Sequence, residues 1–235
     1  MCGIAGFCNE EIPRLDVIHV MTDRMRHRGP DSEGFWLDDH SGWTFGHRRL
    51  SILDLSESGS QPMISASGRL VICFNGEIYN ADLLRDKLIG GNYVKSFRGH
   101  SDTEILLESI EAFGLEETLR QAKGMFAFSV YDRRDRVLRL ARDRAGEKPL
   151  YYGFIRDGAN PPFFAFASDC ALFSCIPGFS CEIDRDALAE FLLYKFVPAP
   201  KSIYKNILKL SPGKDRKSTR LNSSHPTTSR MPSSA

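Results

Sequence analysis

The thiol of Cys2 is the group with the most direct chemical use, because it lies one peptide bond from the N-terminal Met1. If Met1 is removed, Cys2 carries a free α-amine whose ordinary pKa of about 7.7–8.0 is close to that of the thiol, about 8.5. This amine could act as the general base for its own thiol, with little orientation entropy left to lose. The alternative is that Cys2 is a small apolar residue that begins a strand.

A second chemical pattern is the sequence Asn75-Gly76-Glu77, which follows a strand-like run over residues 69–74. The side-chain amide of Asn75 and the backbone N–H of Gly76 could both donate to an oxyanion that develops during acyl transfer. The alternative is a type I′ hairpin turn, for which Asn-Gly is a strong signal. The segment that follows has a helical pattern, so no partner strand comes directly after it. Both interpretations stay open on the sequence alone.

Two charged residues could together recognise a small zwitterion. The guanidinium of Arg49 could bind a carboxylate in a bidentate fashion, and Asp102 could bind an ammonium group. Each has a simpler interpretation: Arg49 as a solvated strand residue, and Asp102 as a first-turn charge that complements a helix dipole.

Short runs rich in β-branched and aromatic residues predict most of the secondary structure as strands. The links between them are too short for parallel crossovers, so the strands are expected to be mainly antiparallel. With helices packed outside such sheets, the fold class is α+β. The strand-like runs are residues 3–7, 43–53, 69–74, 125–132, 136–142, 150–155 and 163–168.

Apolar spacing predicts three helices, over residues 15–26, 102–113 and 185–196. Ser101 with Glu104 three residues later is the signature of a capping box at the start of the second helix. Asp184 is the expected N-cap of the third helix.

The composition excludes several functional classes. The chain has 235 residues, a formal net charge of +1 and 42% hydrophobic residues, which provides no electrostatic case for nucleic acid or an anionic membrane as a partner. No apolar run reaches the ~20 residues of a membrane span, and no secretory signal is apparent. The six cysteines form no C-x-x-C pair and no zinc-type cluster, so we expect a cytoplasmic protein with reduced thiols and no metal site.

Residues 214–235 differ from the rest of the chain. They are rich in Ser, Thr, Lys and Arg, contain almost no apolar residues, and are predicted to be disordered. The change after Pro212-Gly213 is abrupt. Either the segment is a natural tail or the reading frame leaves the true coding sequence there, and the second is favoured because residues 202–213 resemble the lead-in to further protein.

Eight motifs, in this order along the chain, resemble those of glutamine-hydrolysing asparagine synthetases, and the resemblance covers residues 2 to 213. The motifs are CGIAGF at 2–7, RHRGPDSEG at 26–34, GHRRLSILDLS at 46–56, FNGEIYN at 74–80, SDTE at 101–104, GMFAFSVYD at 124–132, ARDRAGEKPLYYG at 141–153 and FVPAPKSIYKNILKLSPG at 196–213.

The resemblance implies a class II glutamine amidotransferase domain over residues 1–183, with the N-terminal-nucleophile hydrolase fold. Four layers, αββα, with two stacked and mainly antiparallel sheets, are expected. Residues 184–213 would connect this domain to an absent synthetase domain, and residues 214–235 would be a disordered or non-native tail. ATP and Mg²⁺ are expected only with the synthetase domain and no cofactor for the glutaminase domain. The resemblance also allows a homodimer for the full-length family.

The resemblance also implies roles for individual residues, with L-glutamine as the small-molecule substrate. Cys2 would be the nucleophile, Asn75 and Gly76 the oxyanion hole, and Arg49 the partner of the glutamine α-carboxylate. Glu77 and Asp102 would bind the α-ammonium group. The pocket would also be lined by the backbone of Leu50, Ser51, Ile52 and Leu53.

Other functions stay open. A related amidotransferase could deliver its ammonia to a sugar or a peptide carboxylate, and a truncated domain could be catalytically idle and act only in assembly. The arginine motif GHRRLSILD at 46–54 favours the synthetase branch. Amidophosphoribosyltransferases and glucosamine-6-phosphate synthases resemble GHTRWATHG more closely at this point.

Overall fold

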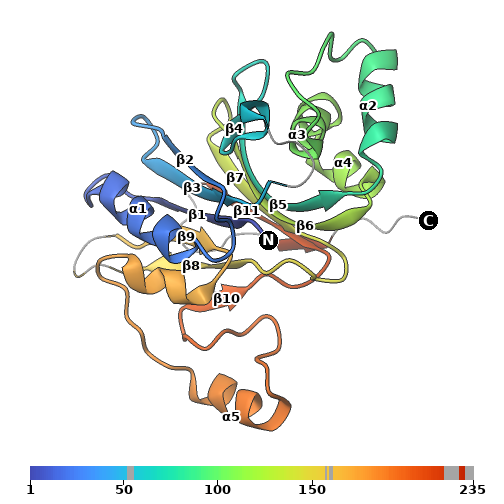
Figure 1. Ribbon diagram of the computed structural model, residues 1–235. Helices are drawn as coiled ribbons and strands as arrows, with labels where there is room; N and C mark the ends of the chain where they lie inside the picture. The colour runs from blue at the N-terminus through green and yellow to red at the C-terminus, as the bar shows by residue number, and fades with distance from the viewer. Residues whose placement is uncertain (52–55, 157, 159–160, 220–227, 231–235) are drawn as a thin grey trace.

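Two antiparallel sheets lie face to face at the centre of the molecule (Figure 1). A computed structural model describes residues 1–51, 56–156, 158, 161–219 and 228–230. The first sheet has, in spatial order, the strands β10 (Ile207–Lys209), β8 (Tyr151–Ile155), β9 (Phe163–Ala167), β1 (Gly3–Cys8), β3 (Trp43–Arg49) and β2 (Ser32–Leu37).

The second sheet is also built from antiparallel neighbours. Its longest pair, β5 and β6, runs in register from Leu70↔Asp132 to Ile78↔Gly124. In spatial order its strands are β12 (Thr228–Arg230), β11 (Lys214–Thr219), β7 (Val137–Arg142), β6 (Gly124–Asp132), β5 (Leu70–Ile78) and β4 (Met63–Ile64).

A dry, aromatic-rich core fills the space between the two sheets. Phe45 of β3 and Tyr131 of β6 meet there, with ring centroids 6.4 Å apart, and Trp43 lies 5.9 Å from the same tyrosine ring. Alternate residues of the strands that line this core face it, as expected for strands that are covered on both faces.

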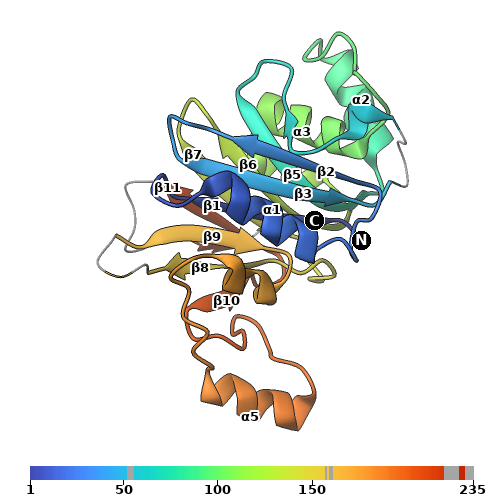
Figure 2. The ribbon, with the colours of Figure 1, turned by 60° about the vertical axis from the view of Figure 1, so that its left-hand side comes forward.

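Helices cover the outer face of each sheet, which gives the expected αββα order of layers (Figures 1 and 2). The first sheet is covered by α1 (Arg14–Arg24) and the 3₁₀ helix η2 (Cys170–Cys175). The second sheet is covered by α2 (Ala81–Gly90), α3 (Asp102–Phe113) and α4 (Leu115–Gln121), while η1 (Glu57–Gly59) lies in the β3–β4 connection. Helix α5 (Arg185–Tyr194) projects away from these layers, below β10 in both views.

Helix α3 begins where the sequence predicts it, but its capping differs. The Ser101 hydroxyl accepts a hydrogen bond from the Thr103 N–H (3.2 Å) and so caps the first turn. Among the described residues, the Glu104 carboxylate accepts from the N–H groups of Arg98 and Gly99 rather than from Ser101. The reciprocal half of the predicted capping box is therefore replaced by a link to the preceding loop.

The predicted disorder of the tail is wrong for residues 214–219. They form β11, which pairs with β7 from Asp215↔Ala141 to Thr219↔Val137. Arg216 is buried and its guanidinium stacks 4.0 Å from the Tyr152 ring. A polar segment can order in this way because the edge of β7 satisfies its backbone N–H and C=O groups without apolar side chains. Residues 220–227 and 231–235 lie outside the described residues, and a non-native origin of the segment stays a prediction.

Within the described ranges, none of the helices has both the length and the apolar character needed to cross a membrane.

Candidate active site

Cys2 lies at the start of β1, next to the end of β3. Strand β1 pairs with β3 from Gly3↔Arg48 onward, which brings Cys2 beside Leu50. The Leu50 N–H donates a hydrogen bond to the Cys2 Sγ (3.4 Å), and the Sγ lies 3.7 Å from the Leu50 carbonyl oxygen. The Arg28 Nε donates to the Cys2 carbonyl oxygen (3.2 Å). The thiol and the backbone carbonyl of Cys2 are thus each held by a hydrogen bond.

A cavity of about 330 Å³ opens beside this thiol. It lies where the ends of β1 and β3 meet the middle of β5 and the first turn of α3. The predicted site residues that line it are Cys2, Arg49, Leu50, Asn75, Gly76, Glu77 and Asp102.

The remaining predicted residues follow directly after Leu50. Ser51 is not among the residues that line the cavity, and its backbone N–H donates to the Asp31 Oδ2 (2.7 Å). Ile52 and Leu53 lie outside the described residues.

Asn75 presents a free hydrogen-bond donor to the cavity. The residue is 1% exposed, and in the described structure its Nδ2 atom is buried with no hydrogen-bond partner. A buried donor without an acceptor costs about 1–3 kcal/mol, so such groups in native proteins call for an explanation. An acceptor oxygen on a bound molecule would satisfy it.

Asn75 and Gly76 do not form the hairpin turn that was the alternative interpretation of their sequence. They lie inside β5, opposite Ala127 and Phe126 of β6. A Cβ atom at position 76 would collide with the carbonyl oxygen of Met125 and lie 2.6 Å from the Phe126 Cα. Glycine is needed here because the neighbouring strand approaches closely, and a flexible turn plays no part.

The Arg49 side chain is held in place by the loop that follows β3. Its Nη1 donates to the Ser56 carbonyl oxygen (2.8 Å), and its guanidinium lies against Gly59, where a Cβ atom would collide with Nη2. Gly59 therefore leaves the room that this guanidinium occupies at the cavity wall.

Asp102 joins α3 to β5 at the cavity. Its Oδ2 accepts a hydrogen bond from the Ile78 N–H (2.9 Å), and the residue is 7% exposed. Burial raises the pKa of this carboxyl, and the nearby Glu77 carboxylate acts in the same direction. The backbone N–H donors of Ile78 and Thr103 oppose this shift. A cationic group in the cavity would favour the charged form of Asp102.

The Cys2 thiol also has a shifted pKa. Burial raises it, while the Leu50 N–H, the N-terminal ammonium group and the Arg49 guanidinium act in the opposite direction. Burial alone does not mark a nucleophile, since it also raises the pKa of the core residue Cys73. What distinguishes Cys2 is its donors and the cavity beside it. Because its thiol is mainly protonated at neutral pH, reaction would need a base.

Sequence reasoning missed several residues of the cavity wall, among them Gln61 and Lys148. The Gln61 Oε1 accepts from the Phe74 N–H (2.6 Å), and its Nε2 donates to the Thr103 hydroxyl (3.3 Å). Gln61 belongs to no recognisable pattern. Lys148 falls inside the motif at 141–153, and that motif was its only signal.

His47 lies behind the cavity and was also missed. It is 1% exposed, and its Nε2 donates to the Phe74 carbonyl oxygen (3.2 Å). Burial lowers the pKa of the ring to about 4, so the imidazole is neutral at physiological pH.

Two facing antiparallel sheets lie between helical layers, and Cys2 lines a cavity together with an amide that has no partner within the described part of the chain. This arrangement defines a hydrolase fold of the N-terminal-nucleophile class. Residues 1–227 match the family described as a glutamine amidotransferase domain. The chain belongs to this family.

Sequence relatives place the chain near one branch of the family. It is 38% identical over 218 residues to asparagine synthetase [glutamine-hydrolyzing] 1 of Bacillus subtilis (strain 168), covering 91% of this chain and 33% of that protein. Asparagine synthetase [glutamine-hydrolyzing] 3 of the same organism is 35% identical over 195 residues, covering 81% of this chain and 30% of that protein. The chain is therefore a glutamine amidotransferase domain related to asparagine synthetases, and it spans about a third of the length of these relatives.

Solved structures support the fold assignment. The glutamine phosphoribosylpyrophosphate amidotransferase of B. subtilis, complexed with ADP and GMP, superimposes with a TM-score of 0.68 at 19% identity, covering 98% of this chain and 49% of that chain. A structure described as the allosteric regulatory enzyme of purine biosynthesis gives a TM-score of 0.69 at 18% identity, covering 99% of this chain and 49% of that chain. At these identities the likeness concerns the fold alone, and it confirms the predicted fold class.

Proposed function

We propose that this chain hydrolyses the side-chain amide of L-glutamine to glutamate and ammonia, with Cys2 as the nucleophile. The observation that carries the proposal is that Asn75, whose Nδ2 has no hydrogen-bond partner among the described residues, lines the same cavity as Cys2. A nucleophile and an unused donor in one cavity are what acyl transfer requires.

The reaction follows from these groups. The α-amine of the processed Cys2 takes the thiol proton, and the thiolate forms a bond to the amide carbon of glutamine. The oxyanion that results accepts hydrogen bonds from the Asn75 Nδ2 and the Gly76 N–H. The C–N bond then breaks as the amine returns its proton to the departing ammonia, which leaves a γ-glutamyl thioester. Water, deprotonated by the same amine, attacks the thioester and releases glutamate, and Cys2 regains its thiol proton.

The charged residues of the cavity wall would select an α-amino acid. Arg49 would bind the α-carboxylate, and Glu77 with Asp102 would bind the α-ammonium group. The positions of a guanidinium and a buried carboxyl on one cavity support this assignment. The backbone of Leu50 would line part of the remaining wall.

Met1 sets a condition on activity. It lines the same cavity, and while it is attached the nitrogen of Cys2 is an amide that cannot accept a proton. The active form would therefore be the chain from which Met1 has been removed.

The ammonia would be used by a synthetase domain of the kind that the longer relatives' names indicate. Relatives named asparagine synthetases support aspartate as the acceptor, and a sugar or peptide carboxylate is the alternative. ATP and Mg²⁺ would act only in a synthetase domain, and that none is needed by the glutaminase domain stays a prediction. The cytoplasmic location, the homodimer and the absence of nucleic-acid partners stay predictions.

The exposed apolar residues of α5 favour a second candidate, an idle domain that acts only in assembly. Phe191, Leu192 and Leu193 are 44%, 64% and 71% exposed. A monomeric chain that turns over glutamine would contradict this candidate.

The test is glutamate release by the purified chain, with removal of Met1 verified by mass spectrometry. We expect Cys2→Ala to abolish release, and Cys181→Ala, which changes an exposed thiol, to leave it unchanged. A chain that retains Met1 after expression with a methionine aminopeptidase inhibitor should be inactive. Full activity of either the Cys2→Ala variant or the Met1-bearing chain would refute the mechanism.

A further inference from the structure

A second cavity, of about 450 Å³, lies on the outer side of the second sheet and shares no residue with the Cys2 cavity. It lies at the start of β5 and the end of α3, whereas the Cys2 cavity lies further along β5 and at the start of α3. Helix α3 has 12 residues, so its two ends are about 18 Å apart. The two cavities are therefore separate sites.

The floor of the second cavity is apolar. It is formed by buried side chains from three neighbouring strands and from α3, and these surfaces would receive an apolar group rather than water alone. The floor residues are Leu70, Ile110, Val130 and Val137.

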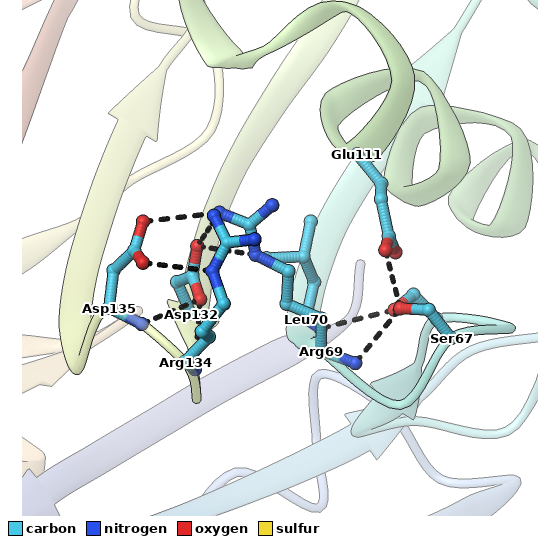
Figure 3. Close-up of polar contacts among 8 residues, drawn as sticks. Ser67, Arg69, Leu70, Glu111, Asp132, Arg134 and Asp135 are labelled. Atoms are coloured by element: carbon cyan, nitrogen blue, oxygen red, sulfur yellow. Dashed lines mark hydrogen bonds and ion pairs between the residues drawn. The ribbon is translucent and has the colours of Figure 1, made fainter.

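One part of the charged rim is already paired. The Arg69 Nε and Nη2 donate to the Asp132 Oδ2 at 2.9 and 2.6 Å, and Nη2 also reaches the Asp135 Oδ2 at 3.1 Å (Figure 3). Figure 3 shows Arg134 beside Arg69, and its Nε donates to the Asp135 Oδ1 at 3.1 Å. This network fixes one wall of the cavity.

Two groups on the rim have unused capacity. Glu111 accepts a hydrogen bond from the Ser67 hydroxyl through Oε1 (Figure 3), but its Oε2 is buried without a hydrogen-bond partner in the described structure. Arg139 lies across the floor on β7, opposite Val130 of β6, and makes no ion pair with any described residue. Among the described residues, Glu111 therefore lacks one donor and Arg139 lacks an anion.

These unused groups restrict the charge of a ligand. A simple anion would meet the carboxylates of Glu111 and Glu116, which outnumber Arg139, the lining arginine that has no ion pair among the described residues. A simple cation would leave Arg139 without a counter-charge. A molecule that carries both charges on an apolar body satisfies Glu111, Arg139 and the apolar floor.

We propose that this second cavity binds a free α-amino acid with an apolar side chain. The α-ammonium group donates to the Glu111 Oε2, the α-carboxylate binds Arg139, and the side chain lies on the floor formed by Leu70, Val130 and Val137. This site takes a ligand other than the glutamine that is proposed for the Cys2 cavity.

The test uses L-leucine and two analogues that each lack one charged group. Binding is measured by titration calorimetry with the full chain, and the site is located by methyl NMR of Val130 and Val137. We expect leucine to bind, and 4-methylpentanoate, without the ammonium group, and 3-methylbutylamine, without the carboxylate, each to bind at least ~10-fold more weakly. Equal affinity for the three compounds, or no binding of leucine, would overturn the proposal.

Variants separate the two ends of the site. Glu111→Gln should remove the preference for leucine over 4-methylpentanoate, and Arg139→Gln the preference over 3-methylbutylamine. Arg133→Gln is the matched control, because Arg133 lies on the same hairpin, is exposed and is absent from the cavity wall. Each variant is checked by thermal unfolding. The analogue series on the unmodified chain remains decisive if a variant does not fold.

Cys2→Ala and Asn75→Ala distinguish the second site from the first. Leucine should bind both variants as it binds the unmodified chain, whether or not the chain hydrolyses glutamine. Loss of leucine binding in these variants, or its displacement by glutamine, would assign the leucine to the Cys2 cavity and overturn the proposal.

Discussion

The Nε2 of His47 on β3 donates a hydrogen bond to the Phe74 carbonyl oxygen on β5, at 3.2 Å, and so joins the two sheets directly behind the candidate active site. Phe74 precedes Asn75, and His47 pairs with Ile4 of the strand that begins beside Cys2. One buried imidazole thus links the strand of the proposed nucleophile to that of the proposed oxyanion donor. The Nε2–H can donate in either protonation state of the ring, and it is the burial of the ring that favours its neutral form.

This link predicts a pH dependence of stability. Burial lowers the pKa of His47 to about 4, below its ordinary value of about 6.5, so between these values the unfolded state binds a proton that the folded state does not. The contribution is full above about pH 6.5, and about 3 kcal/mol of unfolding free energy is lost as the pH falls to about 4. Urea unfolding at a series of pH values measures this loss of unfolding free energy. His47→Gln, which keeps a donor but does not titrate there, should have a shallower dependence, and identical curves would contradict the assignment.

Asn75→Ala should lower kcat for glutamine hydrolysis by a factor of about 100 to 1,000, because it removes one oxyanion donor. KM should change little, since the donor is used mainly in the transition state. Steady-state assays of glutamate release measure both constants. Asn206→Ala, at an exposed asparagine before β10, is the control. A rise in KM with kcat unchanged would indicate that Asn75 contributes to ground-state binding of glutamine instead.

Asp102→Asn should raise KM for glutamine by about 10- to 100-fold, as expected for the loss of a charged hydrogen bond. Because burial raises the pKa of Asp102, its carboxylate is lost at a higher pH than that of an exposed aspartate, and KM should rise as the pH falls through that range. The variant should lack this pH dependence. Asp82→Asn changes an exposed first-turn aspartate of α2 and should leave KM unaltered. An unchanged KM in Asp102→Asn would remove Asp102 from substrate binding.

Gly29→Ala should destabilise the chain by about 1–3 kcal/mol. A Cβ atom at position 29 would collide with backbone atoms of Arg48 and lie 2.6 Å from the Arg49 nitrogen, and backbone cannot move aside as a flexible side chain can. Gly90→Ala is the control, because nothing lies within 4 Å of its Cβ position and alanine is the better helix former. Thermal unfolding of both variants measures the difference. Equal stability would show that β3 can shift at no cost.

Much of the fold could be predicted from the sequence, because the signals are local. Ser101 identifies the start of α3, and Asp184 caps α5 through the N–H groups of Asp186 and Ala187. Other elements lacked such signals. Strand β2 was missed, and the extension of β5 through Asn75 and Gly76 was not anticipated, because Asn-Gly favours a turn unless a partner strand holds it extended.

Residues 214–219 show that composition alone can also predict too little structure. Their composition predicts disorder, and the free edge of β7 orders them all the same. Backbone pairing depends on an available edge, which composition does not report.

The sequence by itself determined which groups could react: a thiol at position 2, an amide at Asn75, and the charges of Arg49 and Asp102. Only the tertiary structure decided that these groups share one cavity, that Leu50 donates to the Cys2 Sγ, and that the Asn75 Nδ2 has no partner within the described residues. The physical reason is that strand register and the packing of one sheet on another bring together residues far apart in the chain. Hydrogen bonding and burial follow from that packing and not from the order of residues.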